Sequence, residues 1–177
     1  MPDSSDLIRI INGCKNGNAE CFSQLIDIYA NRCYGYFYRL TGNRDISDDL
    51  LSELFVKLVT KIGSYKGGIF ESWLFKTASN VFYDHLRDKQ RYKGSLAAQT
   101  ERLESKTAKN GARNDEQIDK LQAQLNKLDE DTKELITLHY YSQLTFKEMA
   151  QMRSEPIGTT LSKLHRGLQK LRQMMDS

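Results

Sequence analysis

A stretch of seventeen residues near the carboxyl end, 156–172, combines cations and hydroxyl groups without a single acidic side chain. At about 3.6 residues per turn, a helix would divide these side chains between two faces. The apolar face would hold Ile157, Leu161, Leu164, Leu168 and Leu171, and the polar face would hold Thr159, Ser162, Lys163, Arg166, Gln169 and Lys170. Cations neutralise phosphates, while hydroxyl, amide and guanidinium groups reach base edges. The pattern therefore predicts a helix that packs on a core and contacts duplex DNA.

The residues just before this stretch predict how such a helix is presented. Thr145 and Glu148 have the spacing of a capping box, which predicts a helix start and a short helix over 146–153. Ser154 and Glu155 suit a tight turn, and Pro156 fits the first turn of the next helix. A short helix, a tight turn and a longer basic helix are typical of a helix-turn-helix unit.

The hydrophobic pattern divides the chain into three parts. Helical periodicity runs from Asp6 to about Lys93, is lost between Gly94 and Asp115, and returns from Ile118, while strand patterns are almost absent. The interval is rich in small and polar residues, which favours a flexible linker. We predict an all-α protein of two small helical domains, at 1–95 and 119–177, joined by a linker at 96–118. The second main helix of the first domain, opening near Asp45, should bury Leu50, Leu51, Leu54, Phe55, Leu58 and Val59.

Size and composition narrow the class of protein. The sequence has 177 residues, 39% of them hydrophobic, which is enough to bury a core in one ordinary domain or two small ones. No apolar run approaches the roughly 18 residues needed to span a bilayer, and the first residues lack the charge and apolar order of a signal peptide. We therefore expect a cytoplasmic protein with no direct membrane insertion.

Side chains that often support catalysis or metal binding are scattered. Cys14, Cys21 and Cys33 show no CxxC spacing, His85, His139 and His165 lie far apart, and no glycine-rich phosphate loop is present. We expect no enzymatic activity, no cofactor and no metal site.

Charge is patterned locally rather than in bulk. The formal net charge is only +3, yet acidic residues gather at Asp45, Asp48, Asp49 and Glu53, and basic residues gather over 87–93 and along the final helix. We therefore expect any binding to depend on these local patches rather than on the net charge.

Six blocks of this chain, taken in order, resemble a known family. They are residues 22–30, 45–58 (DISDDLLSELFVKL), 70–87 (FESWLFKTASNVFYDHLR), 128–140, 144–150 (LTFKEMA) and 156–166. The chain resembles the sigma-70 type initiation factors of bacterial RNA polymerase, in the small extracytoplasmic-function subgroup. The resemblance covers nearly everything except the linker.

The resemblance implies roles for three sets of residues. Docking on the clamp of core RNA polymerase would involve Asp49, Leu50, Glu53 and Phe55. Opening and holding the minus-ten element would involve Tyr65, Lys66, Phe70, Lys76, Asn80, Asp84, Arg87 and Arg91, with Asp84 orienting its basic neighbours and Trp73 more suited to the core. Reading the minus-thirty-five element in the major groove would involve Thr159, Ser162, Lys163, His165 and Arg166.

The resemblance also implies partners: the clamp and flap regions of core RNA polymerase, promoter DNA, and a cognate anti-sigma factor. Five residues depart from those that the resemblance leads us to expect. Ser154 and Glu155 replace glycine and an aliphatic residue, Thr160 replaces valine, Leu161 replaces lysine or arginine, and Ser52 replaces glutamine. Glu155 would bring negative charge near DNA, and Leu161 would remove a phosphate contact.

Other functions remain open on the residues alone. One is a helix-turn-helix regulator that acts without polymerase, and another is a protein that binds the core enzyme but not DNA.

Overall fold

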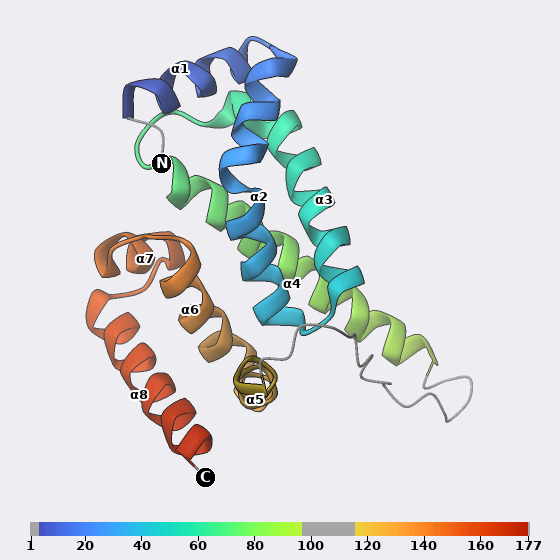
Figure 1. Cartoon of the computed structure of the whole chain (residues 1–177), viewed down its shortest axis with the longest axis vertical. Helices are drawn as coiled ribbons and strands as arrows, with labels where there is room; N and C mark the ends of the chain where they lie inside the picture. Colours follow the sequence, from blue (N-terminus) through green and yellow to red (C-terminus); the bar gives the residue numbers. More distant parts are fainter. Residues whose placement is uncertain (1–3, 97–115, 177) are drawn as a thin grey trace.

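All the secondary structure that the computed structural model describes, over residues 4–96 and 116–176, is helical, which confirms the all-α prediction. The helices of the front half (residues 4–96) are α1 (Ser4–Lys15), α2 (Ala19–Thr41), α3 (Arg44–Lys61), the short 3-10 helix η1 (Ile62–Ser64) and α4 (Phe70–Leu96). Those of the rear half (residues 116–176) are α5 (Glu116–Leu125), α6 (Glu130–Tyr141), α7 (Phe146–Arg153) and α8 (Ile157–Asp176). Figure 1 shows the two halves side by side. The predicted linker, 96–118, lies largely outside the described residues; its described ends belong to α4 and α5.

Short polar caps set the ends of the long helices. The Asn18 side chain accepts a hydrogen bond from the Cys21 amide, 3.1 Å away, and starts α2. Gly42, at φ +64°, ends that helix in the left-handed conformation that glycine adopts without steric cost. Asn43 then caps α3 by accepting from the Ile46 amide at 3.0 Å. These caps turn the chain sharply, so that α2 and α3 lie side by side (Figure 1).

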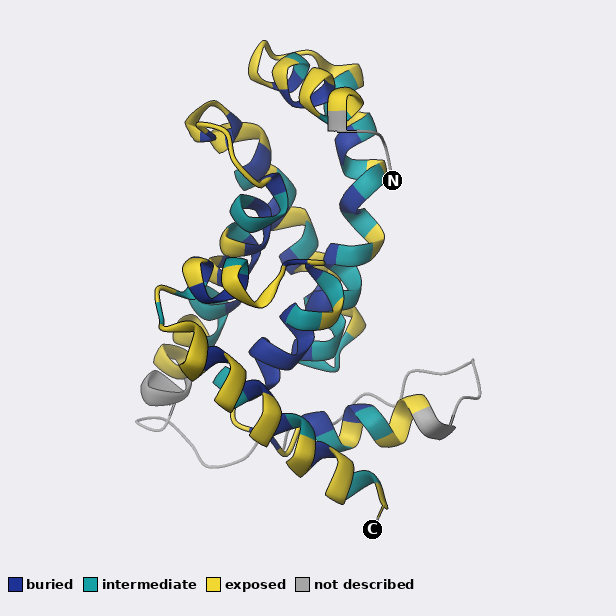
Figure 2. Ribbon diagram, turned by 90° about the vertical axis from the view of Figure 1, so that its left-hand side faces the viewer, coloured by how far each residue is buried: buried dark blue, intermediate teal, exposed yellow. Residues whose placement is uncertain are grey.

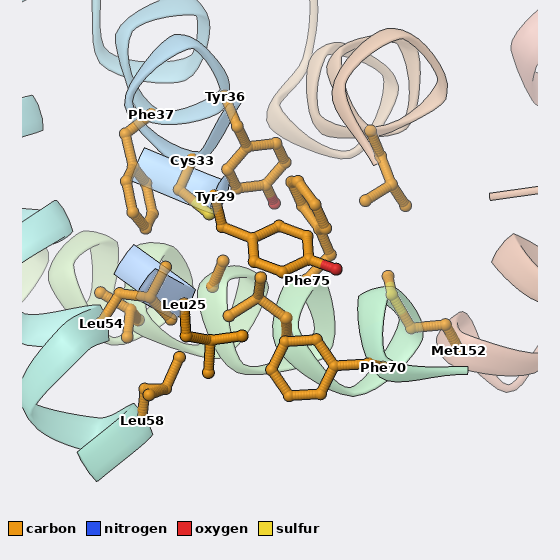
Figure 3. Close-up of a cluster of buried hydrophobic side chains, with 14 of the residues drawn as sticks. Leu25, Tyr29, Cys33, Tyr36, Phe37, Leu54, Leu58, Phe70, Phe75 and Met152 are labelled. Carbon is orange, nitrogen blue, oxygen red and sulfur yellow. The ribbon is translucent and has the colours of Figure 1, made fainter. Parts of the chain in front are cut away.

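Large aromatic side chains fill the front core. Tyr29, Tyr36, Phe37, Phe75 and Phe82 are all almost completely buried. Figure 3 shows Tyr29, Tyr36 and Phe37 of α2 together with Phe75 of α4 and with leucines from α2 and α3. Aromatic rings bury much apolar area each, so this cluster holds α2, α3 and α4 in fixed relative positions.

A smaller leucine-rich core organises the rear half. Leu125, Leu135, Ile136, Leu164 and Leu171 pack together between α5, α6 and α8. The structure also packs the rear half onto the front half, because the rear-half residues Leu138, Leu144, Met149 and Met152 belong to the front core. Nothing in the sequence pattern predicted this contact between the halves.

The buried face of α8 differs from the predicted one. Ile157 and Leu161 are 47% and 40% exposed, whereas Thr160 is fully buried. Gly167 is buried against α6, where a Cβ atom would press on the Thr132 side chain. At about 100° per residue, the buried stripe is rotated by about 50° from the predicted one. Small residues allow α8 to approach α6 closely, and this close packing outweighs the apolar pattern. On α3, Val59 was likewise predicted to be buried and is 47% exposed.

Candidate nucleic-acid and polymerase interfaces

The outer face of α3 is acidic with an apolar edge. Asp45, Asp48, Asp49 and Glu53 are exposed, and Glu53 pairs with Lys57 at 2.7 Å. The prediction of Leu50 as a contact residue is corrected here: it is 3% exposed because it packs in the front core.

The apolar part of the outer α3 surface is Val56, which is 63% exposed and which the sequence pattern did not single out. Phe55 is half-buried and packs against the front core, so only part of its side chain is accessible at this surface. Exposed carboxylates beside an exposed valine form a surface suited to a basic partner with an apolar patch.

Two aromatic residues predicted to contact unpaired bases lie in the core instead. Tyr65 and Phe70 are 8% and 2% exposed, with ring centroids 5.4 Å apart. The Tyr65 hydroxyl donates to the Gly68 carbonyl at 2.7 Å and so closes the loop before α4. Their rings stabilise this loop and are not available for stacking, which corrects both predictions. The loop itself presents Lys66 and Ile69, both exposed.

One face of α4 carries the remaining predicted minus-ten residues on successive turns: Lys76, Asn80, Asp84, Arg87 and Arg91. Asp84 lies between two cations, in an ion pair with Arg87 and 3.4 Å from Lys57 Nζ. The Arg87 guanidinium is the main cause of the lowered pKa of the Asp84 carboxyl.

Asp84 therefore bridges α3 and α4 and orients Arg87, while Asn80, Arg87 and Arg91 stay exposed. Lys76 is exposed, but its ammonium donates to the Met152 carbonyl of α7 at 2.9 Å. Tyr92, next to Arg91, is 74% exposed and was not predicted as a contact residue.

Helices α7 and α8 form the predicted helix-turn-helix. Thr145 Oγ1 accepts from the Glu148 amide at 3.3 Å, and Glu148 Oε2 accepts from the Thr145 amide at 2.7 Å, so the capping box is present. Ser154 ends α7 with φ at +56°, in the left-handed region. This conformation favours glycine, the residue that the resemblance led us to expect at this position.

Glu155, in the turn, does not project its charge outward. Its carboxylate accepts from Arg153 Nε and Thr160 Oγ1, each at 3.0 Å, and from Lys163 Nζ at 2.8 Å. Burial opposes its ionisation, but these three donors leave the pKa of Glu155 below its ordinary value. The departures at Thr160 and Glu155 are therefore linked, because the buried Thr160 hydroxyl donates to the Glu155 carboxylate and does not reach the surface.

The exposed face of α8 holds most of the predicted duplex contacts. Thr159, Ser162, His165 and Arg166 are exposed, and Figure 2 shows the exposed residues along the outer side of this helix. Lys163 is partly buried and pairs with Asp131 at 3.1 Å as well as with Glu155. The exposed Ile157 and Leu161, placed on the core face by the sequence pattern, add apolar surface at the start of the helix.

Two further features of the described residues concern other site types. Within residues 4–96 and 116–176, no cluster of three or more histidine, cysteine, aspartate or glutamate side chains could hold a metal ion. None of the described helices combines the length and apolar character that crossing a membrane requires.

Comparisons with known proteins match both halves. The family model for sigma-70 region 2 matches residues 25–92, and that for sigma-70 region 4 matches residues 118–171. The extracytoplasmic-function (ECF) RNA polymerase sigma factor SigW of Bacillus subtilis is 27% identical over 176 residues, which is 93% of this chain and 94% of that protein. The ECF RNA polymerase sigma factor SigE of Mycolicibacterium smegmatis is 30% identical over 161 residues, covering 87% of this chain and 61% of that longer protein.

Two solved structures share the fold. The sigma factor RpoE of Bartonella quintana, in complex with the anti-sigma factor NepR, has a TM-score of 0.71 at 24% identity and covers 88% of this chain and 96% of its own. CnrH, in complex with the cytosolic domain of CnrY, has a TM-score of 0.71 at 20% identity over 98% of both chains. The front half thus matches region 2 and the rear half region 4 of one family, and the chain belongs to the sigma-70 family of RNA polymerase sigma factors, in its ECF subgroup.

Proposed function

We propose that this sigma factor divides its work among three surfaces: α3 binds core RNA polymerase, α4 holds the minus-ten element and α8 reads the minus-thirty-five element. The observation that carries the proposal is the separation of the charges. An acidic surface lies on α3, whereas exposed cations lie on α4 and α8. A single DNA-binding surface would not need an acidic face of this size.

The acidic surface of α3 suits a protein partner rather than DNA. Asp48, Asp49 and Glu53 are exposed beside Val56, so carboxylates can pair with partner arginines while the valine is buried. DNA would be repelled from this face by the same charges. We assign core-polymerase binding to Asp49, Glu53 and Val56, with Phe55 supporting them from below.

The α4 surface suits a strand whose bases are unpaired. Asn80 offers an amide for base edges, and Arg87 and Arg91 offer cations for the backbone. With Tyr65 and Phe70 in the core, we assign stacking and wedging to the exposed Ile69 and Tyr92 at the two ends of this surface.

The α8 surface suits a duplex. Thr159, Ser162 and Arg166 lie one turn apart on its exposed side, which is the arrangement of a recognition helix in the major groove. Exposed Leu161 replaces a phosphate contact by apolar surface that can meet thymine methyl groups. We assign His165 to the phosphate edge of this contact.

The proposal extends to the setting. The factor would act in the cytoplasm with no reaction or cofactor of its own, because polymerase supplies the chemistry. One solved relative, RpoE of Bartonella quintana, was co-crystallised with an anti-sigma factor, so we include an inhibitor protein of this kind among the partners.

Reconstituted transcription tests the division of work. The full chain is combined with core RNA polymerase and a library of promoters that vary in both elements. A double reversal, Asp49→Lys with Glu53→Lys, should abolish polymerase binding, while Arg166→Ala should leave it unchanged and weaken initiation only at promoters that keep the minus-thirty-five element. The charge control reverses two exposed acids of α2, Glu20→Lys with Asp27→Lys.

Loss of polymerase binding in the control as well would remove the assignment to α3. Specific binding of duplex without any stimulation of initiation would instead favour a regulator that acts apart from polymerase.

A further inference from the structure

Helix α1 lies against the loop from which the front half presents Ile69. The apolar face of α1, with Ile10, Ile11 and Cys14, is buried in the front core, and α1 contacts η1. Figure 1 shows the loop between η1 and α4 passing close to α1. This helix precedes residues 25–92, which match the sigma-70 region 2 model, so the match assigns it no role.

The loop itself, residues 65–69, has little intrinsic preference for one conformation. Gly67 and Gly68 have φ at +101° and +94°, values that glycine adopts without steric cost. A segment with two adjacent glycines has many alternative conformations, so other contacts must select the observed one. The position of the Ile69 side chain therefore depends on what holds the 65–69 loop at each end.

The carboxyl end of the 65–69 loop is held by α4. The Ile69 carbonyl accepts from the Ser72 amide at 3.1 Å and from the Trp73 amide at 3.4 Å, as expected for the residue that precedes a helix. Phe70 follows directly and is buried in the front core. These contacts hold Ile69 on the carbonyl side of its backbone.

The amino end of the 65–69 loop is held by Tyr65. Its hydroxyl donates at 2.7 Å to the Gly68 carbonyl, which belongs to the peptide group that joins Gly68 to Ile69. Burial is the main cause of the raised pKa of Tyr65, so the hydroxyl keeps its proton at neutral pH and remains a donor. The Tyr65 ring meets the rings of Phe70 and Trp73, with centroids 5.4 and 5.9 Å away. The orientation of this ring therefore sets the position of the peptide group before Ile69.

Lys15, the last residue of α1, contacts the same ring. Its Nζ lies 5.1 Å from the centroid of the Tyr65 ring, in a cation–π arrangement. Lys15 is exposed, whereas Tyr65 is only 8% exposed. The carboxyl end of a helix carries partial negative charge, which also favours a cation at this position. Helix α1 therefore reaches the 65–69 loop through Lys15.

We propose that α1 braces the 65–69 loop for strand opening, with Lys15 as a positioning residue for Ile69 that acts through Tyr65 and Gly68. The inference rests on the proposed function, in which Ile69 is an apolar wedge at one end of the α4 surface. A wedge unstacks bases only where it enters the duplex, and each misplaced conformer of the loop lowers the fraction of molecules that can open a promoter. Helix α1 thus contributes to opening without belonging to a DNA-binding surface.

The experiment uses the full chain with core RNA polymerase and a promoter that carries a fluorescent base analogue in the minus-ten element. Thermal melting first shows that each variant folds. Lys15→Met removes the cation and keeps a long apolar stem, and should slow strand opening about two- to fivefold, as expected for loss of an exposed cation–π contact. Lys15→Arg keeps a cation over the ring and should open like wild type. Arg9→Met is the matched control, because it makes the same charge change at an exposed position of α1.

Two further measurements separate positioning from direct contact with DNA. A promoter whose minus-ten region is mismatched needs no wedge, so Lys15→Met should initiate there like wild type. Tyr65→Phe keeps the ring but removes the hydrogen bond to Gly68, and should slow opening of the duplex promoter alone. In an Ile69→Ala background, which itself opens slowly, Lys15→Met should cause no further loss, because its effect passes through the missing side chain.

The outcomes separate this inference from the proposed function. Wild-type opening by Lys15→Met, or an equal loss for Arg9→Met, would overturn the positioning role. A loss for Lys15→Met that is as large on the mismatched promoter, or that persists in the Ile69→Ala background, would show that Lys15 contacts DNA or only stabilises the fold. All these results leave the proposed function standing. Failure of the wild-type chain to open any duplex promoter, or undiminished opening by Ile69→Ala, would instead overturn the proposed function or its wedge, and this inference with it.

Discussion

Lys163 Nζ donates a hydrogen bond of 2.8 Å to Glu155 Oε2, so the acidic residue of the turn holds one of the cations predicted to contact DNA. The same carboxylate also accepts from Arg153 and Thr160. Charge in this part of the rear half is therefore already compensated inside the protein before DNA arrives. A departure from the family that looked unfavourable for DNA binding proves to be part of how the turn is built.

Glu155→Gln should strengthen binding to a duplex with a minus-thirty-five element. Lys163 would keep only Asp131, 3.1 Å away, and could reach a phosphate, so the slope of log affinity against log salt should steepen by up to about 0.9. Titrations of duplex at several salt concentrations measure it. Glu130→Gln makes the same charge change at Lys133 and should leave the slope unchanged. An unaltered slope for Glu155→Gln would show that Lys163 does not approach the backbone.

Ser154→Gly should stabilise the protein. Ser154 has φ at +56°, where a residue with a Cβ atom is destabilised by about 1 kcal/mol relative to glycine. The greater conformational freedom of glycine in the unfolded chain offsets part of this difference. A gain of up to about 1 kcal/mol should raise Tm by about 2–4 °C for a chain of this length. Ser52→Gly, at an exposed helical position of α3, should lower Tm instead. Equal shifts for both would contradict this account.

Features encoded by neighbouring residues were predictable from the sequence. The capping box at Thr145 and Glu148 and the turn before Pro156 involve residues at most three apart, and the structure contains both. The all-α class and the α7–α8 unit follow from such local signals and from the helical period.

Features set by distant packing were not predictable. The hydrogen bonds of Arg32 and Tyr36 to the rear half join residues about a hundred positions apart, and periodicity within one helix says nothing about them. The rotated face of α8 depends on Gly167 fitting against α6. The resemblance predicts Tyr65 and Phe70 as DNA contacts, whereas the structure buries both. An aromatic residue has the same sequence signature in a core and on a stacking surface, so the sequence does not separate the two.

Gly167→Ala should destabilise the rear half. The added Cβ would press on the Thr132 and Ile136 side chains, and overpacking of this kind costs about 1–3 kcal/mol. Gly158→Ala adds the same methyl group to the same helix with nothing within 4 Å, and should be neutral or stabilising by up to about 1 kcal/mol. Chemical denaturation of both variants provides the comparison. Equal stability of the two would mean that α8 does not approach α6 so closely.

Acidification should weaken the start of α6 through Asp129. Its carboxylate accepts from the Thr132 amide at 2.9 Å, and this bond is the main cause of its lowered pKa. A folded pKa below the unfolded value of about 3.9 gives stability that is present above pH 4 and lost as the pH falls through the folded pKa. Asp129→Asn keeps a capping oxygen and should flatten this part of the pH–stability curve, whereas Asp129→Ala should cost about 1 kcal/mol at neutral pH. An unchanged pH–stability curve for Asp129→Asn would show that the Asp129 carboxylate does not cause the loss of stability at acidic pH.

Val56→Asp should weaken polymerase binding without affecting folding. Val56 is 63% exposed, so the free energy of unfolding should change by less than about 0.5 kcal/mol. Burying a valine in an interface contributes about 1.5 kcal/mol, so its replacement by a charge should weaken binding at least about tenfold. Ile8→Asp, at a 60% exposed position of α1, is the matched control and should bind like wild type. The outcome therefore decides whether the exposed Val56 on α3 forms part of the polymerase contact. Undiminished binding by Val56→Asp would place the polymerase contact on another face of the front half.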